Sequence, residues 1–227
     1  MSGYLKSYVA AAMEKDPAAT SKTMVLFTYP GVKALMWHRP ANWCYRHKMK
    51  FLARVISQHV RFWTGIEIHP GATIGKGVFI DHGAGVVIGE TAEVGNNVTL
   101  YQGVTLGGTG KDAGKRHPTI EDNVVIAAGA KVLGPFTVGK GSKIGAGSVV
   151  LKPVPENCTV VGVPGRIVKQ DGKRVDSLNQ VELPDPVLEE LRRINARLTQ
   201  IENLSGINCS RYSIANEENT NSTETID

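Results

Sequence analysis

Aliphatic residues recur along the middle of the chain at every sixth position between residues 68 and 150. The period shifts by two residues at 86–88 and is interrupted at 107–117. A period of six matches neither the 3.6 of an α-helix nor the 2 of an ordinary strand. The fourteen positions are all aliphatic and mostly β-branched: Ile68, Ile74, Ile80, Val86, Ile88, Val94, Leu100, Leu106, Ile120, Ile126, Val132, Val138, Ile144 and Val150.

This pattern predicts short strands joined by turns, each strand sending one aliphatic side chain into a shared interior. Three units make a triangular coil of about 18 residues, and the repeats supply roughly four coils. We therefore expect a mainly β fold, a left-handed parallel β-helix of hexapeptide repeats over residues 67–168. The 25 glycines and the 6% aromatic content suit an architecture of many tight turns.

Residues 1–66 show helical spacing instead, over 4–15 and roughly 32–63, with breaks expected at Pro17, Pro30 and Pro40. We expect an α-helical cap that covers the unpaired edge of the first coil. The aromatic residues of this region are expected to form its core: Trp37, Trp43, Tyr45, Phe51, Phe62 and Trp63.

The chain after the repeats is expected to leave the solenoid at its prolines and to form a linker and an amphipathic helix over 169–204. An apolar stripe at steps of three and four marks that helix: Leu188, Leu191, Ile194, Leu198, Ile201 and Leu204. Such a stripe can form a coiled coil between subunits or pack on the chain's own β-helix. Asn, Ser, Thr and Glu dominate 205–227, which predicts a disordered tail.

Composition narrows the function classes. The net charge is +5, but the basic residues are scattered and not interleaved with aromatics, which argues against a nucleic-acid partner. Three cysteines without paired spacing argue against a disulfide framework or a zinc site. No signal peptide or membrane-spanning run is visible, so we expect a reduced, cytoplasmic protein with no membrane association.

Candidate chemistry begins with Asp81 and His82, which stand immediately before the run Gly83-Ala84-Gly85. Glycines there let a ligand approach the backbone. A histidine near neutral pKa can remove a proton from an alcohol as the alcohol attacks a thioester. Glu67 lies fifteen residues earlier, one layer below on a coil, and is a candidate to orient the imidazole. A surface histidine paired with a surface acid is the alternative interpretation.

The interruption 107–117 has the sequence GGTGKDAGKRH and predicts a loop expelled from the coil, where function is often found. Arg116 and His117 at its end suggest that the substrate carries an anionic group, unless they form a merely solvated loop tip. His69, His82 and His117 raise the question of zinc, but their spacing does not imply a shared metal, and His69 beside Pro70 is expected to be structural. From the residues alone, the prediction reaches acyl or related transfer with a histidine base and an anionic acceptor.

The chain also resembles bacterial serine O-acetyltransferases from about Asp16 to Val168. The matching stretches are KDPAA (15–19), IHPGATIGKGVFIDHGAGVVIGETA (68–92), VTLYQGVTLGGTGK (98–111), KRHPTI (115–120), GAKVLGPFTVG (129–139) and KIGAGSVVLKPVP (143–155). The hexapeptide repeat alone indicates a broad acyltransferase superfamily. The combination of DHGAGVVIGETA, TLGGTGK and KRHP is narrower and implies that serine is the acceptor.

The resemblance implies acetyl transfer from acetyl-CoA, a co-substrate rather than a bound cofactor, to the L-serine hydroxyl in cysteine biosynthesis. It implies that His82 is the general base for direct attack. Asp81 and Asp16 would hold the serine amino group, and Arg116 with His117 its carboxylate. Homotrimers with the site between adjacent β-helices, and feedback inhibition by cysteine, are also implied. The acyl-donor groove would include Gly108, Thr109, Ala128, Lys143 and Ala146.

Three features depart from the family pattern. Glu67 stands where well-studied members have an aspartate behind the histidine. The amino-terminal helical region is short, which favours a trimer over the dimer of trimers of longer members. The sequence ends with Ile226 followed by Asp227, whereas family members dock a terminal isoleucine into O-acetylserine sulfhydrylase, and this ending argues against that complex.

Other functions on the same scaffold remain open from the sequence. The acceptor hydroxyl could belong to homoserine or to a sugar. A zinc-dependent hydratase, and a catalytically silent scaffold that recruits partners, are alternatives from other classes.

Overall fold

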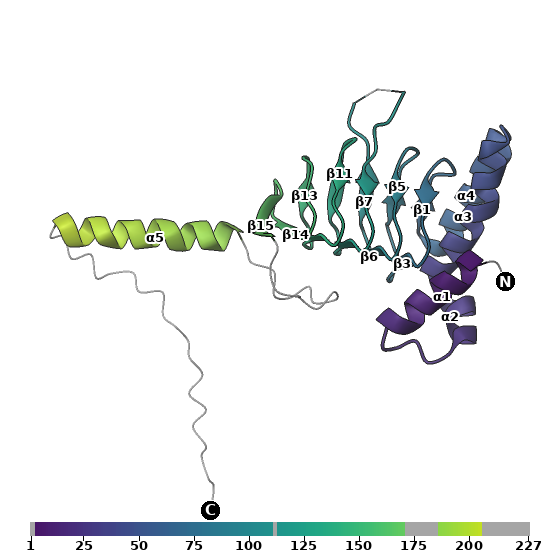
Figure 1. Cartoon of the computed structure of the whole chain (residues 1–227), viewed down its shortest axis with the longest axis horizontal. Helices are drawn as coiled ribbons and strands as arrows, with labels where there is room; N and C mark the ends of the chain where they lie inside the picture. Colours follow the sequence, from purple (N-terminus) through teal and green to yellow (C-terminus); the bar gives the residue numbers. More distant parts are fainter. Residues whose placement is uncertain (1–2, 111–112, 171–185, 206–227) are drawn as a thin grey trace, which may run out of the picture. The chain divides into compact units, whose positions relative to one another are not determined.

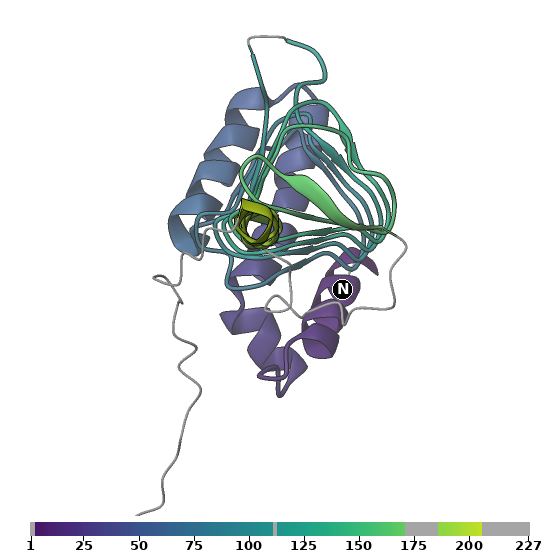
Figure 2. The ribbon, with the colours of Figure 1, turned by 90° about the vertical axis from the view of Figure 1, so that its left-hand side faces the viewer.

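A computed structural model describes residues 3–110, 113–170 and 186–205. The centre of the molecule is a parallel β-helix whose strands stack in three sheets, with one strand of each coil in each sheet (Figure 1). Seen end-on, the coils superimpose as a triangle (Figure 2). Repeating coils explain the six-residue period, because each face of the triangle presents the same inward position in every coil.

The three sheets, here called A, B and C, follow one another around the triangle. Sheet A contains β1 (Glu67–Ile68), β4 (Val87–Ile88), β7 (Thr105–Gly107), β10 (Lys131–Leu133) and β13 (Val149–Val150). Sheet B contains β2 (Thr73–Ile74), β5 (Glu93–Val94), β8 (Thr119–Ile120) and β11 (Thr137–Val138). Sheet C contains β3 (Phe79–Ile80), β6 (Thr99–Leu100), β9 (Val125–Ile126), β12 (Lys143–Ile144), β14 (Cys158–Val161) and β15 (Arg166–Gln170).

The predicted interior is confirmed: each of the fourteen aliphatic positions is at most 5% exposed. Thirteen of them lie in strands, and Val86 lies in the two-residue slip between β3 and β4. The slip keeps the register, because Ile68 still pairs with Ile88 and Ile74 with Val94. The core is therefore a continuous aliphatic column with no space for a ligand between the sheets, and chemistry is confined to the outside.

The solenoid continues past Val150, inside the predicted bounds of 67–168. The segment after Val150 does not leave the coil at its prolines, because β14 pairs in parallel with β12 and buries Cys158 and Val160. Only then does β15 turn back and pair antiparallel with β14. The reversed strand covers the hydrogen-bonding edge that the last coil would otherwise leave open.

Four helices precede the solenoid: α1 (Gly3–Lys15), α2 (Lys22–Thr28), α3 (Pro30–Arg46) and α4 (Lys50–Thr64). They form one compact unit with the β-helix, and α1, α3 and α4 pack on its first coil. The expected breaks at Pro17 and Pro30 are confirmed, since Pro30 occupies the first turn of α3. The break expected at Pro40 is wrong: α3 runs through this residue, whose exposed ring meets no neighbouring element.

The expectation of an aromatic core in the helices is also wrong. Small and aliphatic residues such as Ala34, Leu35 and Ala53 fill the inner face, since α3 approaches the coil closely. A Cβ at Gly31 would lie only 2.2 Å from the carbonyl oxygen of Ile80. The large rings are left on the outer face, and only Tyr45 is half-buried. The exposed rings are Trp37 (50%), Trp43 (57%), Phe51 (86%), Phe62 (79%) and Trp63 (71%).

A separate unit begins at Val187 and contains the last described helix, α5 (Pro186–Ser205). The predicted amphipathic helix is thereby confirmed within 169–204, while residues 171–185 and the predicted disordered tail after 205 lie outside the described residues. In the part of the chain that the structure describes, no helix is long and apolar enough to cross a membrane.

Candidate functional site

Two edges of the triangular solenoid hold the predicted site residues. The His82 edge joins sheet C to sheet A and consists of residues 81–86, 101–104, 127–130 and 145–148. The Arg116 edge joins sheet A to sheet B and consists of residues 69–72, 89–92, 108–110, 113–118 and 134–136. The expelled loop belongs to the Arg116 edge, where it rises above the stacked coils in Figure 1.

At the His82 edge, the chain turns sharply after β3 and presents His82 outward. The turn is closed by the Gly83 N–H, which donates to the Asp81 carbonyl at 2.6 Å. His82 adopts a left-handed backbone conformation with φ of 55°, which is uncommon for a residue with a side chain and recurs at functional sites. Its side chain is 76% exposed, and its Nε2 lies 3.8 Å from Asp81 Oδ1. The imidazole is thus available to an external ligand.

The predicted acid pair is brought together across 65 residues of sequence. Asp16 follows α1, and its Oδ2 accepts a hydrogen bond of 2.5 Å from the Tyr29 hydroxyl. Burial and the neighbouring Asp16 carboxylate raise the pKa of Asp81, while His82 opposes that rise. The hydrogen bond to Asp16 raises the pKa of Tyr29 to about 12, so the phenol remains a donor. Two carboxylates that repel one another form an apt site for a cation such as an ammonium group.

Glu67 lies where the sequence predicted, one layer below this edge, because its N–H donates to the Val86 carbonyl at 2.9 Å. Its carboxylate, however, pairs with two arginines of α4, Arg61 at 3.4 Å and Arg54 at 3.9 Å. Within the described chain, no ion pair joins Glu67 to His82. The structure therefore places the two residues on neighbouring layers without bringing their side chains together.

Above His82, the same edge forms a column of small residues. The Gly103, Gly129 and Gly147 N–H groups donate to the carbonyl one coil below, at 2.8 to 2.9 Å, and all three glycines have positive φ. Three of the predicted acyl-donor residues belong here: Ala128 is half-buried and Ala146 exposed on the edge, and Lys143 lies beside it on β12. Glycine recurs on this edge in each coil, beside Ala84, Gln102, Ala128 and Ala146, and small side chains at most of these positions let a thin, extended chain lie along it.

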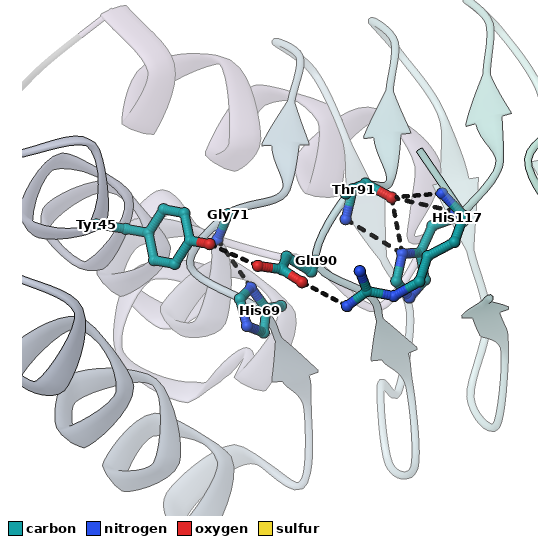
Figure 3. A network of polar contacts seen from close by, with 7 residues as sticks. Tyr45, His69, Gly71, Glu90, Thr91 and His117 are labelled. Atoms are coloured by element: carbon teal, nitrogen blue, oxygen red, sulfur yellow. Dashed lines mark hydrogen bonds and ion pairs between the residues drawn. The ribbon is translucent and has the colours of Figure 1, made fainter. Parts of the chain in front are cut away.

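At the Arg116 edge, Arg116 is held by a chain of polar contacts that reaches the helical cap. Figure 3 shows Glu90 and Tyr45 within this chain. Its Nη2 donates to Glu90 Oε2, and the Tyr45 hydroxyl of α3 donates to Glu90 Oε1 at 2.5 Å. The hydrogen bond from Tyr45 and the pairing with Arg116 lower the pKa of Glu90, which keeps this carboxylate ionised. His69 packs edge-on against Tyr45, and its Nδ1 accepts from the Gly71 N–H at 3.0 Å, which fits the structural role that we predicted for it.

His117 is held in one tautomer by Thr91 (Figure 3). The Thr91 hydroxyl oxygen accepts from the Arg116 and His117 N–H groups at 3.1 and 3.2 Å. It therefore directs its proton to His117 Nδ1, 2.9 Å away, and the Thr91 N–H donates to the same nitrogen at 3.2 Å. Because Nδ1 accepts, the neutral ring carries its proton on Nε2. Burial and Arg116 lower the pKa of His117, which favours this neutral form as a hydrogen-bond donor.

The remaining acyl-donor candidates, Gly108 and Thr109, also lie on the Arg116 edge. Both are exposed at the start of the expelled loop. A Cβ at Gly108 would lie 3.1 Å from the Arg116 carbonyl oxygen and 3.3 Å from His117 Nε2, so glycine leaves room around the imidazole. No group of three or more His, Cys, Asp or Glu residues in the described chain is arranged to hold a metal ion.

The two halves of the predicted site do not meet within one chain. A face of the triangle is about six residues long, so at about 3.3 Å per residue its edges lie roughly 15–20 Å apart. The charged groups that shift the pKa of Asp81 are His82 and Asp16, both near the His82 edge. Those that shift the pKa of His117 are Arg116, Glu90 and Lys115, all near the Arg116 edge, which is consistent with two separate halves.

Sequence reasoning missed four residues that shape these halves. Glu90 and Thr91 stand inside the quoted motif GETA, yet that motif gave no indication of their partners. Tyr29 lies between α2 and α3 and Tyr45 lies on α3, and both are too far along the chain from Asp81 and Glu90 for any local pattern to link them. Only the fold brings them to the two edges.

Comparison with known proteins first shows the class of protein to which the chain belongs. Residues 117–152 match the bacterial transferase hexapeptide family of six repeats, which fits a left-handed parallel β-helix. The chain is 59% identical over 199 residues to the serine acetyltransferase of Bacillus subtilis (strain 168), covering 87% of this chain and 92% of that protein. It belongs to the serine acetyltransferase family.

Solved structures agree with this assignment. A serine acetyltransferase in complex with cysteine superposes with a TM-score of 0.76 at 41% identity, over 79% of this chain and 70% of that one. The serine acetyltransferase of Brucella abortus strain S19, in complex with coenzyme A, superposes with a TM-score of 0.71 at 45% identity, over 74% and 68% of the two chains. The predicted family is thus confirmed, and the hexapeptide repeats, parallel sheets and N-terminal helices fit the predicted left-handed β-helix.

Proposed function

We propose that this serine acetyltransferase transfers acetyl directly from acetyl-CoA to the hydroxyl of L-serine, with His82 as the general base. The exposed imidazole of His82, beside the Asp16 and Asp81 carboxylates, is the observation that carries the proposal. His82 takes the hydroxyl proton as the serine oxygen attacks the thioester carbonyl. A carbon–oxygen bond forms, the carbon–sulfur bond breaks, and the leaving CoA thiolate takes the proton from the imidazolium.

The two edges hold opposite ends of serine. The ammonium group of serine lies against Asp16 and Asp81, where two carboxylates are held close together. Its carboxylate is bound by the Arg116 guanidinium and by the Nε2–H of His117, a donor pair that Glu90 and Thr91 hold in place. The serine hydroxyl then points to His82 between them.

Acetyl-CoA lies along the column of small residues that rises from His82. Ala128 and Ala146 line the pantetheine arm and Lys143 lies beside it, while Gly108 and Thr109 approach from the Arg116 edge. The coenzyme A complex of the Brucella abortus relative supports this donor. The cysteine complex of another relative supports inhibition by cysteine, which shares the ammonium and carboxylate of serine.

A complete site requires two copies of the chain. Because the edges of one chain lie roughly 15–20 Å apart, the His82 edge of one copy must meet the Arg116 edge of the next. Each copy uses both edges, so the arrangement is head-to-tail, and a ring of three closes it with three equivalent sites. A homotrimer is the assembly that we propose.

The first test is release of free CoA from acetyl-CoA and L-serine by the purified full chain. His82→Ala should lower kcat by at least about 100-fold, the usual contribution of a general base. His59→Asn, a matched change at an exposed histidine of α4, should leave turnover unaltered. Undiminished turnover in His82→Ala would refute the mechanism.

Acceptor choice is tested with serine, homoserine, threonine and a sugar alcohol. The structure favours an amino acid over a sugar, because Arg116 and the acid pair match a carboxylate and an ammonium group. Arg116→Ala should raise KM for serine by at least about tenfold, consistent with loss of a charged hydrogen bond. An enzyme whose best acceptor is a sugar should be insensitive to this change.

A further inference from the structure

An apolar stripe on α5 is exposed to solvent. Leu191, Ile194, Leu198 and Ile201 follow one another at steps of three, four and three, and are 51%, 45%, 50% and 59% exposed. This spacing places Leu191 and Leu198 at the a positions of a heptad, and Ile194 and Ile201 at the d positions. An exposed a/d stripe on a 20-residue helix is the surface of a coiled coil.

We infer that α5 associates with the α5 helices of two further copies of this chain as a parallel three-stranded coiled coil. The identity of the core residues specifies more than two strands. Leucine at a with isoleucine at d disfavours the parallel dimer and shifts the preference to three or four helices. The choice of three rests on the proposed homotrimer, which supplies three copies of α5.

Charge decides the direction of the helices. In an antiparallel pair that matches all four core residues, Leu191 packs on Ile201 of the other copy. Arg197 then faces Arg197 of the other copy, and like charges on neighbouring helices are destabilising. In the parallel arrangement, Glu190 at position g faces the uncharged Asn195 at position e of the next helix. The parallel arrangement therefore avoids the repulsion.

Length explains why this contact needs the rest of the protein. Twenty residues span about 30 Å, and two heptads of core are marginal for helices that associate freely. Copies attached to one assembled β-helix trimer associate within a single particle, which removes most of the entropic cost. The helix thereby ties together the same three chains that form the proposed sites.

The test uses the full chain in a Cys209→Ser background, since Cys44 and Cys158 are buried. Leu198→Cys places a thiol in the core, and Asn195→Cys places one beside it with the stripe intact. Ala196→Cys, the neighbouring residue on the outermost position f, is the matched control. A three-armed maleimide should join three chains in the first two variants and leave the control as single chains. Oxidation alone should also join two Leu198→Cys chains, because equivalent a positions meet only in the parallel arrangement.

Single chains in both test variants, or equal cross-linking in the control, would overturn the inference. A product of two chains only would exclude three strands. Release of CoA by the same preparations separates this result from the proposed function. Active enzyme without cross-linking refutes the coiled coil alone, whereas cross-linking of variants whose Cys209→Ser parent and wild type are both inactive refutes the proposed acetyl transfer alone.

Discussion

Mixing two impaired variants tests directly whether the site lies between copies of the chain. The His82→Ala variant has a defective His82 edge, and the Arg116→Ala variant has a defective Arg116 edge. If each site combines the His82 edge of one copy with the Arg116 edge of the next, a mixed trimer of these variants contains one site in which both edges are intact. A site built within a single chain could never be restored in this way.

The expected magnitude follows from the geometry. Co-expression in equal amounts leaves about a quarter of the trimers with one variant only, and at serine concentrations below KM these retain at most about a tenth of wild-type turnover. The remaining three quarters each have one intact site of three, so the preparation should show about a quarter of wild-type turnover. CoA release at serine concentrations below KM is the assay, because Arg116→Ala acts through serine binding.

A matched mixture supplies the control. Pairing Arg116→Ala with His59→Asn leaves every His82 intact, so about half of the sites should be active. Turnover at the level of the separate variants in the first mixture, together with half-activity in the second, would refute a site shared between edges. Equal turnover in the two mixtures would show that the edges do not act as partners.

Three further variants test the support of the site and of the fold. Glu90→Gln should raise KM for serine about tenfold while KM for acetyl-CoA stays unchanged, because Arg116 loses an ionic partner; equal changes in both constants would contradict this. Burial lowers the pKa of His38 from 6.5 to about 4. Because His38 is harder to protonate in the folded protein, the free energy of unfolding is highest above pH 6.5 and falls by about 3 kcal/mol as the pH decreases towards 4. Urea unfolding across this range should show that loss in the wild type and a flatter profile in His38→Gln. Gly31→Ala should destabilise the protein by about 1–3 kcal/mol, since the new methyl group meets the Ile80 carbonyl, and an unchanged melting temperature would contradict the tight docking of α3.

The sequence predicted the solenoid well because every coil repeats one environment. Ile126 stacks between Leu100 and Ile144, just as Leu100 stacks between Ile80 and Ile126. Because every inward position has neighbours of the same kind, the six-residue period encodes the core directly. The helices offer no such repetition. The position of Trp37 on the outer face follows from how closely α3 docks on the coil, and Pro40 is tolerated because its side of the helix is exposed.

The sequence indicated candidate site residues but not the contacts that support them. His82 and Arg116 stand beside glycine-rich turns, which mark exposed edges in any solenoid. The link from Tyr45 through Glu90 to Arg116 joins residues 45 and 26 positions apart, and no local pattern reports such contacts. The separation of the two edges likewise becomes visible only when each turn is assigned to a corner of the triangle.

The aliphatic interior supports the proposal that the site is shared between copies of the chain. A solenoid filled by its own side chains has no internal pocket, and each edge offers a convex surface that cannot enclose a substrate. Bringing two edges together creates the missing concavity. Glu67 fits this view: its ion pairs with Arg54 and Arg61 have lengths of 3.9 and 3.4 Å and involve arginines that are 42% and 56% exposed. Pairs of this kind contribute little to stability, so releasing one arginine, which the orienting role predicted for Glu67 requires, would cost little.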